Sequence, residues 1–444
     1  MLMNLVVALV ALLVVQQPAA TGQPASAALA TATAAIAAAA GPGPCVTAAR
    51  VFVGKRQQEV RPPTGYTSEV LKQVDQEKQT LIQTCVNRFG SAATPDSNLA
   101  GLADLYSEAG QPAQAKTALD RALASKTLSE PDRADALAMA VRITLKEPKG
   151  DARNVVLEQL VGNLDRLSAA CFDQKFEAHR AMLGYYRYDD IDGGIITHAA
   201  WLIDAAKSFS PEQRKKNASS VVNAHVDMAE AWAGQGMNDQ ALALLRRAKT
   251  EWSDTPRVAD MVDPEIARLE LVGTPGAILT APRWLNLPAG KADLDLKGSV
   301  TLLEFSAHWC VPCKESYPGV NRLRQKYGPK GFQVVIATQL YGYFQTERNL
   351  DADTEFERDK TYFAEHGLDV PIAVGGKTAA PTRKADGTYE YQRDPNDDHY
   401  RVGGIPQIML IDKAGKIRLM MVGYDDANEE KLARMIEGLL AEKK

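Results

Sequence analysis

The stretch that decides the fold is VTLLEFSAHWCVPCKESYP, residues 300–318. Its first six residues form a largely apolar run that is typical of a buried strand. The residues after the second cysteine have a helical pattern, so the motif Trp309-Cys310-Val311-Pro312-Cys313 lies between a strand and a helix. Pro318 would kink that helix. The stretch therefore predicts a strand, a turn that carries two cysteines, and a helix.

The two cysteines have the spacing of a redox pair. At the start of a helix, the Cys310 sulfur would face unpaired backbone N–H groups and the positive end of the helix dipole, which stabilise a thiolate. Cys313 lies three residues on, near enough to close a disulfide. The alternative is half of a zinc site, but the sequence has no second cysteine pair and no nearby His-x-x-x-His. We therefore expect a redox dithiol and no metal.

From Gly273 onward, strand and helix patterns alternate. Apolar runs predict further strands at 332–337, 408–411 and 417–422, and helical patterns cover 313–327, 353–366 and 427–441. The linker Asp412–Gly415 has the Asp and Gly of a hairpin turn. This order predicts an α/β domain over residues 273–444.

Two blocks of this region resemble the thioredoxin superfamily, and most closely its extracytoplasmic TlpA/ResA-like branch. The first block is Lys297-Gly298 together with residues 300–318, and the second is YRVGGIPQIMLIDKAGKI, residues 400–417. They occur in the order that the family has, with room between them for the additional helix of this branch. The resemblance covers residues 278–442 and implies a thioredoxin-like fold.

The resemblance also implies roles for individual residues. Cys310 would be the nucleophile and Cys313 the resolving thiol. The Ile405–Pro406 bond would be cis and lie beside the disulfide, where its backbone groups could bind a substrate chain. Gly423 matches a late glycine that opens the same surface. The substrate-binding residues would be Trp309, Ile405 and Gly423.

Three positions depart from the pattern of the branch. Its members usually have Glu three residues after the second cysteine, where this chain has Ser316; Glu315 is one residue short and should not face the thiols. We expect Ser316→Ala to do little. Glu304 lies six residues before Cys310, where thioredoxin has a buried acid, and we expect it to move protons for the resolving cysteine. His308 could tune the thiolate, but a solvated loop histidine is the favoured interpretation.

Residues 45–272 have a helical pattern throughout. Within them, 99–123 and 225–248 share a spacing of large and small residues that resembles a tetratricopeptide repeat. Each would be a helix hairpin, with Gly110 and Gly236 at the turns. One interpretation is a surface that binds a protein partner, and the other is a hairpin array that only packs against its neighbours. The pattern favours neither.

The start of the chain predicts export. Leu5–Val15 is an apolar run too short to span a bilayer, and Ala25-Ser26-Ala27 fits a cleavage site, so residues 1–27 are predicted to be a signal peptide. The first residues carry no Lys or Arg, which leaves an uncleaved anchor or a misplaced start as alternatives. Residues 28–44 are predicted to be a flexible linker. In an exported protein, Cys45 and Cys85 could form a structural disulfide.

The composition excludes other classes of function. The 444 residues include 51 Lys and Arg against 55 Asp and Glu, which gives a net charge of −4. Because no basic block stands out, a nucleic-acid partner has no support. Five cysteines are too few for a disulfide scaffold.

These observations favour an exported thiol-disulfide oxidoreductase that needs no organic cofactor. Its partners would be protein thiols and disulfides, an upstream thiol electron donor, and a protein bound by the helical region. Val311-Pro312 between the cysteines resembles reductants more than strong oxidants, so the reductase direction is favoured. The alternative is an adaptor in which the helical repeats bind partners and the thioredoxin fold is a docking module.

Overall fold

The structure is a computed structural model that describes residues 26–61, 68–90, 94–188, 192–276, 278–376, 382–383, 389–390, 394–424 and 426–442. The chain forms two compact units, of which the first ends at Ala178 and the second runs from His179 to Lys444. In the described part of the chain, no helix has both the length and the apolar character needed to cross a membrane. Residues 1–25, which hold most of the predicted signal peptide, lie outside the described residues.

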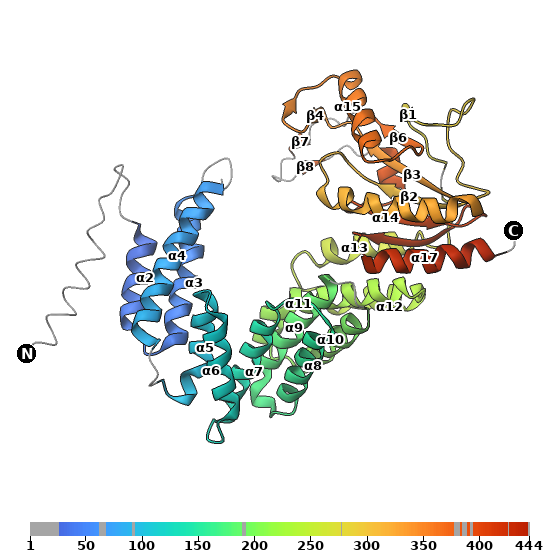
Figure 1. Cartoon of the computed structure of the whole chain (residues 1–444). Coiled ribbons are helices and arrows are strands. Elements are labelled where there is room, and N and C mark those ends of the chain that lie inside the picture. The colour runs from blue at the N-terminus through green and yellow to red at the C-terminus, as the bar shows by residue number, and fades with distance from the viewer. Residues whose placement is uncertain are drawn as a thin grey trace, which may run out of the picture. The chain divides into compact units, whose positions relative to one another are not determined.

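The first unit is built from helices. They are α2 (Ala27–Ala38), α3 (Pro42–Glu59), α4 (Ser68–Phe89), α5 (Leu99–Glu108), α6 (Pro112–Ala124), α7 (Glu130–Thr144), α8 (Asp151–Asp165) and the beginning of α9 (Phe172–Tyr188), with short 3₁₀ turns at Asp96–Asn98 and Ala169–Cys171 (Figure 1). The core shared by α2 to α7 is made largely of Ala and Leu side chains, and the small Ala side chains allow these helices to approach closely. Cys171, the cysteine outside both disulfides, is buried.

Most of the segment 28–44 is helical, since α2 ends at Ala38 and α3 begins at Pro42, so the prediction of a flexible linker is wrong. Ser26 caps α2 by accepting a hydrogen bond from the backbone N–H of Leu29 at 3.1 Å. Ala28, Ala32 and Ile36 form one buried face of this helix. Alanine has the highest helix propensity, and the spacing of four places these side chains against the core that α2 shares with α3 and α4. Composition alone does not distinguish such a helix from a tether.

Cys45 on α3 and Cys85 on α4 are joined by a disulfide with a Cα–Cα distance of 5.9 Å. Both side chains are fully buried. The bond links two adjacent helices of the first unit and closes a loop across a sequence separation of 40.

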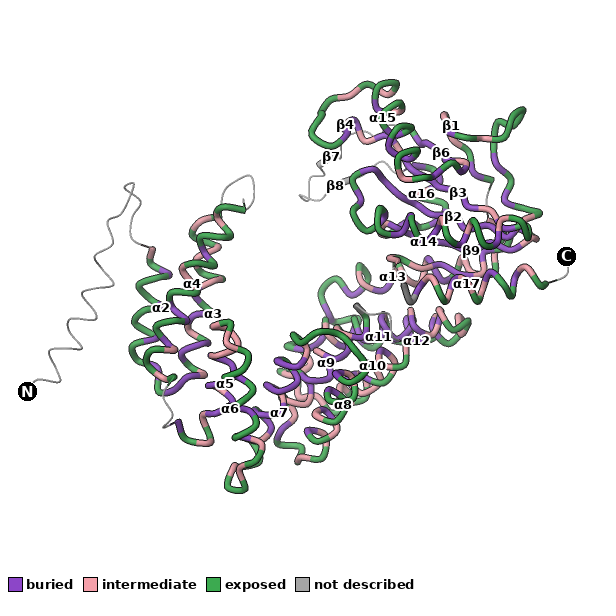
Figure 2. The backbone as a smooth tube through the Cα atoms, viewed as in Figure 1, coloured by how far each residue is buried: buried purple, intermediate pink, exposed green. Residues whose placement is uncertain are grey.

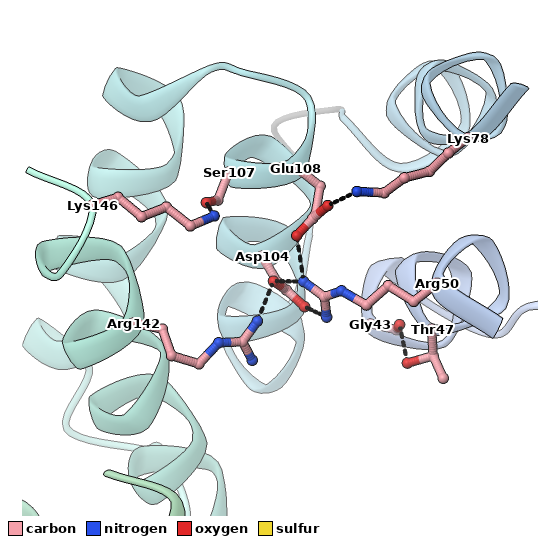
Figure 3. Close-up of polar contacts among 9 residues, drawn as sticks. All are labelled: Gly43, Thr47, Arg50, Lys78, Asp104, Ser107, Glu108, Arg142 and Lys146. Carbon is pink, nitrogen blue, oxygen red and sulfur yellow. Dashed lines mark hydrogen bonds and ion pairs between the residues drawn. The ribbon is translucent and has the colours of Figure 1, made fainter. Parts of the chain in front are cut away.

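A polar network also links the helices of the first unit (Figure 3). Arg50 of α3 donates two hydrogen bonds of 2.7 Å to Asp104 of α5 and one of 2.8 Å to Glu108. Lys78 of α4 also binds Glu108, and Arg142 of α7 binds Asp104. Burial would raise the pKa of Glu108, but hydrogen bonds from Arg50 and Lys78 outweigh it and hold that pKa at about 2. The Glu108 carboxylate is therefore held as an anion, and the hydrogen bonds to Asp104 and Glu108 link the four helices α3, α4, α5 and α7.

The second unit begins with helices, which are followed by a sheet and the helices that cover it. The helices after α9 are α10 (Asp192–Ala205), α11 (Pro211–Gly234), α12 (Asn238–Glu251) and α13 (Val258–Leu269), with a 3₁₀ turn at Ala206–Ser208. The predicted hairpins are present as α5–α6 and α11–α12. Gly110 and Gly236 lie at their turns with φ of 71° and 82°, a conformation that favours glycine.

Six strands form the main sheet within the described residues, in the order β1-β6-β3-β2-β9-β10. They are β1 (Arg283–Leu285), β2 (Val300–Phe305), β3 (Phe332–Gln339), β6 (Ile372–Gly375), β9 (Gln407–Ile411) and β10 (Ile417–Val422). β2 pairs with β3 in parallel and with β9 in antiparallel orientation. Short two-residue strands make separate pairs: β4 (Tyr343–Phe344) with β5 (Glu347–Arg348), and β7 (Thr382–Arg383) with β8 (Tyr389–Glu390).

Helices α14 (Val311–Tyr327), α15 (Ala352–Glu365) and α17 (Asp426–Ala441) pack in the core on one face of this sheet, and α16 (Pro395–His399) is a short helix before β9. β2 and β9 are buried along their whole length (Figure 2). Side chains alternate between the two faces of a strand. Leu302 belongs to the core under α14 and Leu303 to the core on the opposite face, so Glu304 points to the side of α14. The strand thus places a carboxyl group beneath the cysteine-bearing helix.

Candidate active site

The two cysteines of the motif form a disulfide at the start of α14. Cys310 is the N-cap of the helix, and the backbone N–H of Cys313 points at its sulfur at 3.2 Å. The Cα atoms are 5.3 Å apart. When the bond is reduced, the same N–H and the helix dipole would stabilise a thiolate at Cys310. The structure is therefore that of the oxidised dithiol.

The loop before β9 lies against this disulfide. The Ile405–Pro406 peptide bond is cis, and the carbonyl oxygen of Ile405 is 3.7 Å from the Cys310 sulfur. Gly423, at the end of β10, donates a backbone hydrogen bond of 2.8 Å to the carbonyl oxygen of Pro406. Two segments that are far apart in the sequence from Cys310 thus meet beside it.

Apolar side chains are exposed around the dithiol. Trp309, Val311 and Val422 are 45%, 63% and 42% exposed, whereas Cys310 is 4% exposed and Cys313 is fully buried. An exposed apolar surface around a reactive group is a common feature of sites that bind other chains. Of the two sulfurs, only that of Cys310 has any access to this surface.

Glu304 is fully buried and lies close to the first turn of α14. The hydroxyl of Ser316 lies 2.9 Å from Glu304 Oε1 and 2.7 Å from the backbone carbonyl oxygen of Cys313. Burial raises the pKa of Glu304 to about 8, and the hydrogen bond from Ser316 partly offsets that effect. Glu304 can therefore both release and accept a proton near neutral pH.

The other two departures from the family pattern have different outcomes. Glu315 is exposed, as expected from its one-residue displacement on the helix. His308, predicted to be solvated, is 6% exposed and packs on Tyr343 and Phe344 at ring distances of 5.3 and 4.8 Å. Burial lowers the pKa of His308 to about 4, so its ring is neutral at pH 7. It therefore provides no cation for the Cys310 thiolate.

Three features of the site were not foreseen from the sequence. Ser316 contacts Glu304, although its position one helical turn after Cys313 was available as a signal. Glu355 of α15 accepts the backbone N–H groups of Tyr341 and Gly342, both at 2.6 Å, and Tyr341 packs edge-on against Trp309. Helix α15 thereby supports the loop beside the tryptophan. No local pattern links these segments, which are brought together by the fold.

Comparison with known proteins places this geometry in a family. A family model described as Redoxin matches residues 291–436, which include both cysteines, Glu304 and Pro406. Thiol-disulfide oxidoreductase ResA from Bacillus thuringiensis is 30% identical over 163 residues, which are 36% of this chain and 74% of that protein. The chain belongs to the ResA family of thiol-disulfide oxidoreductases. Its thioredoxin-like part carries the similarity.

Other relatives match a similar share of the chain. Protein DipZ from Mycobacterium bovis is 29% identical over 174 residues, 38% of this chain and 21% of that protein. A crystal structure of a thiol-disulfide isomerase from Corynebacterium glutamicum is 23% identical, covers 38% of this chain and 98% of that chain, and has a TM-score of 0.29. As a member of the ResA family, the protein is a thiol-disulfide oxidoreductase, and a helical region precedes its thioredoxin-like domain.

Proposed function

We propose that the protein is an extracytoplasmic protein-disulfide reductase that acts through Cys310 and Cys313. The observation that carries this proposal is the position of the Cys310 sulfur, between the N–H of Cys313 and the carbonyl oxygen of Ile405. The first contact favours a thiolate, and the second lies where an incoming chain could bind the backbone. The ResA family supplies the class of chemistry.

The reduced protein would begin the reaction at Cys310. Its thiolate attacks one sulfur of a substrate disulfide, the substrate S–S bond breaks, and the other substrate sulfur leaves as a thiolate. Cys313 then loses its proton and attacks the Cys310 sulfur of the mixed disulfide. The substrate leaves as a dithiol, and two electrons have passed from the protein to it. An upstream thiol donor restores the dithiol.

Glu304 is the proposed base of the second step. Cys313 is fully buried, so water has poor access to its proton. Glu304 lies on the α14 side of β2, and Ser316 joins it to the Cys313 backbone. A carboxyl group with a pKa of about 8 can take up a proton from a thiol of ordinary pKa at little cost.

Substrate chains are proposed to bind between Trp309, Ile405 and Gly423. Trp309 offers an exposed ring, and the loop of Ile405 offers backbone groups beside the sulfur. Gly423 lies at φ 91°, and a Cβ there would meet no atom within 4 Å, so the space above it is open. These features suit an extended polypeptide more than a small thiol.

The remaining parts of the proposal rest on the sequence. The apolar start of the chain supports export, and the α5–α6 and α11–α12 hairpins resemble tetratricopeptide units that could bind a protein partner. The change from helix to strand, between the end of α13 at Leu269 and the start of β1 at Arg283, supports a domain boundary near residue 273. Helices α10 to α13 nevertheless lie in the same compact unit as the sheet.

Turnover of a model protein disulfide tests the proposal. Wild-type protein should reduce it in the presence of a dithiol donor, Cys310→Ser should be inactive, and Cys313→Ser should accumulate the mixed disulfide. Cys171→Ser is the matched control and should retain activity. Absence of turnover by the wild-type protein would favour the adaptor alternative, and full activity of Cys310→Ser would show that turnover does not pass through Cys310. A Cys310/Cys313 reduction potential near −120 mV, roughly that of a strong oxidant, rather than near −270 mV would overturn the reductase direction.

A further inference from the structure

One hydroxyl group lies between two acceptors beneath the dithiol. Ser316 Oγ is 2.9 Å from Glu304 Oε1 and 2.7 Å from the carbonyl oxygen of Cys313. Ser316 and Glu304 are both fully buried, so water does not compete for these contacts. A hydroxyl carries one proton and can donate to only one acceptor at a time. Its direction must therefore depend on the protonation state of the carboxyl group.

Ser316 makes different hydrogen bonds with the ionised and the protonated forms of Glu304. An ionised Glu304 is only an acceptor, and Ser316 donates to it. A protonated Glu304 can donate to Ser316 Oγ, which frees the serine proton for the Cys313 carbonyl oxygen. Glu304 Oε2 has no hydrogen-bond partner among the described residues, so Ser316 is the donor on which the anion depends.

We propose that Ser316 is the positioning residue for the base of the resolving step: its hydroxyl holds the Glu304 carboxylate under the first turn of α14 and favours its ionised form. The inference rests on the proposed function, because it concerns the base assigned there. It replaces the expectation that Ser316→Ala does little. The carboxyl group in this chain is on the strand, and the helix supplies the hydroxyl that supports it.

The other titratable groups close to Glu304 do not change their own charge while Glu304 titrates in the oxidised protein. Tyr317 of α14, Tyr362 of α15 and Tyr424 after β10 lie near enough to interact with its charge. Burial raises the pKa of each phenol above its usual value, so all three stay neutral while Glu304 titrates. Asp359 of α15, whose pKa burial raises to about 8, titrates in the same range, but its charge does not contribute to the pKa of Glu304. Cys313, next to Glu304, could also ionise in that range. In the oxidised protein it does not titrate, which allows the pKa of Glu304 to be measured without coupling.

The direct experiment is a carboxyl NMR titration of the oxidised full-length protein. Removing the donor penalises the anion more than the neutral acid, so Ser316→Ala should raise the pKa of Glu304 by roughly one unit. Ser316→Thr keeps a hydroxyl, so the pKa of Glu304 in this variant should be close to its wild-type value. Ser306→Ala is the matched control, because Ser306 is buried nearby and bonds the Tyr317 hydroxyl at 2.6 Å instead. An unchanged Glu304 pKa in Ser316→Ala would overturn the proposal.

The kinetic experiment measures resolution of the mixed disulfide against pH by stopped flow. In Ser316→Ala the rate at pH 7 should fall about 10-fold and the profile should move to higher pH, with wild-type rates approached when Glu304 is ionised. A purely structural effect would instead lower the rate at every pH. In the Glu304→Gln background, adding Ser316→Ala should not change the resolution rate further. Comparison of Glu304→Gln with the double variant therefore tests the proposal even if Ser316→Ala alone does not fold.

The outcomes separate the inference from the proposed function. If Cys310→Ser keeps full turnover, the dithiol proposal fails and the role of Ser316 fails with it. If the dithiol is active and Glu304→Gln slows resolution, but Ser316→Ala leaves both the pKa and the profile unchanged, only the positioning role is wrong. A Ser316→Ala effect that persists in the Glu304→Gln background would also overturn it, because Ser316 would then act independently of the carboxyl group.

Discussion

The backbone N–H of Gly423 donates a 2.8 Å hydrogen bond to the carbonyl oxygen of Pro406, which ties the end of β10 to the loop beside the Cys310 sulfur. Gly423 has φ of 91°, a conformation that residues with a Cβ rarely adopt. The bond and the loop therefore depend on glycine at this position.

Gly423→Ala should destabilise the protein by roughly 1–2 kcal/mol, because alanine is strained at this φ although space for its Cβ exists. Denaturant unfolding followed by circular dichroism measures the change. Gly403→Ala is the control, since Gly403 lies in the same loop, has open space around it and has no positive φ. Equal stabilities of the two variants would show that the Gly423 conformation imposes no strain.

Reduced Cys310 should react with iodoacetamide at least about 10-fold faster than Cys313 at neutral pH. Cys310 has a stabilising N–H and some access to solvent, whereas Cys313 is fully buried. Peptide mass spectrometry after short labelling measures both rates. Equal labelling of the two cysteines would reverse or remove the assignment of nucleophile and resolving thiol.

Glu304→Gln should fold and should be more stable than wild type at neutral pH. The pKa of Glu304 is raised to about 8 in the folded protein. Below the pKa of the unfolded state the carboxyl group is protonated in both states, so it does not lower the free energy of unfolding there. As the pH rises from roughly 4 to 8, the wild type loses stability that the variant keeps, and the difference levels off above pH 8. Unfolding midpoints measured across this range check the sign.

The same Glu304→Gln variant should form the mixed disulfide at Cys310 normally but resolve it roughly 10- to 100-fold more slowly. The amide has the shape of the carboxyl group but cannot take the proton of Cys313. Stopped-flow kinetics of resolution at the wild-type rate would show that solvent, or another group, removes this proton.

Cys45 and Cys85 should be recovered as one disulfide-linked peptide pair from unreduced protein that has been exported. Replacing both with serine should cost about 4 kcal/mol by the chain-entropy estimate for a loop of this size, because the unfolded chain gains freedom. Cys171→Ser, which breaks no disulfide, is the control. Free thiols at Cys45 and Cys85 in exported material would contradict the pairing.

Arg50→Ala should destabilise the first unit by roughly 1–3 kcal/mol, because it leaves Asp104 and Glu108 with fewer donors in a partly buried site. Arg142→Ala removes a more exposed partner of Asp104 and should cost less. The low pKa of Glu108 stabilises the fold above about pH 4, and this stabilisation is lost as the pH falls towards 2. A weaker acid dependence in Arg50→Ala would support the network.

Several structural features were predictable from local signals. These features are the apolar run of β2, the spacing of the two cysteines and the block around Pro406. Each depends on residues that are close together in the sequence, so each can be recognised without knowing the tertiary structure. The sequence motifs also predicted a nucleophile at Cys310, a resolving thiol at Cys313 and the buried carboxyl group of Glu304, of which the structure confirms the burial. The glycines at the two helix-hairpin turns were predictable for the same reason, since a left-handed turn is a local requirement.

Other features were decided only by the tertiary structure. Residues 28–44 have the composition of a linker, but burial of Ala28, Ala32 and Ile36 against α3 and α4 stabilises a helix there. His308 precedes the motif as a loop residue would, yet Tyr343 and Phe344, which follow β3 in the chain, enclose it and keep it neutral. Ser316 and Glu304 lie on different elements, and whether a serine is idle or supports a buried carboxylate depends on how a helix packs over a strand. The sequence by itself determined which groups could react, and the packing of distant elements decided their charge, access and hydrogen-bond partners.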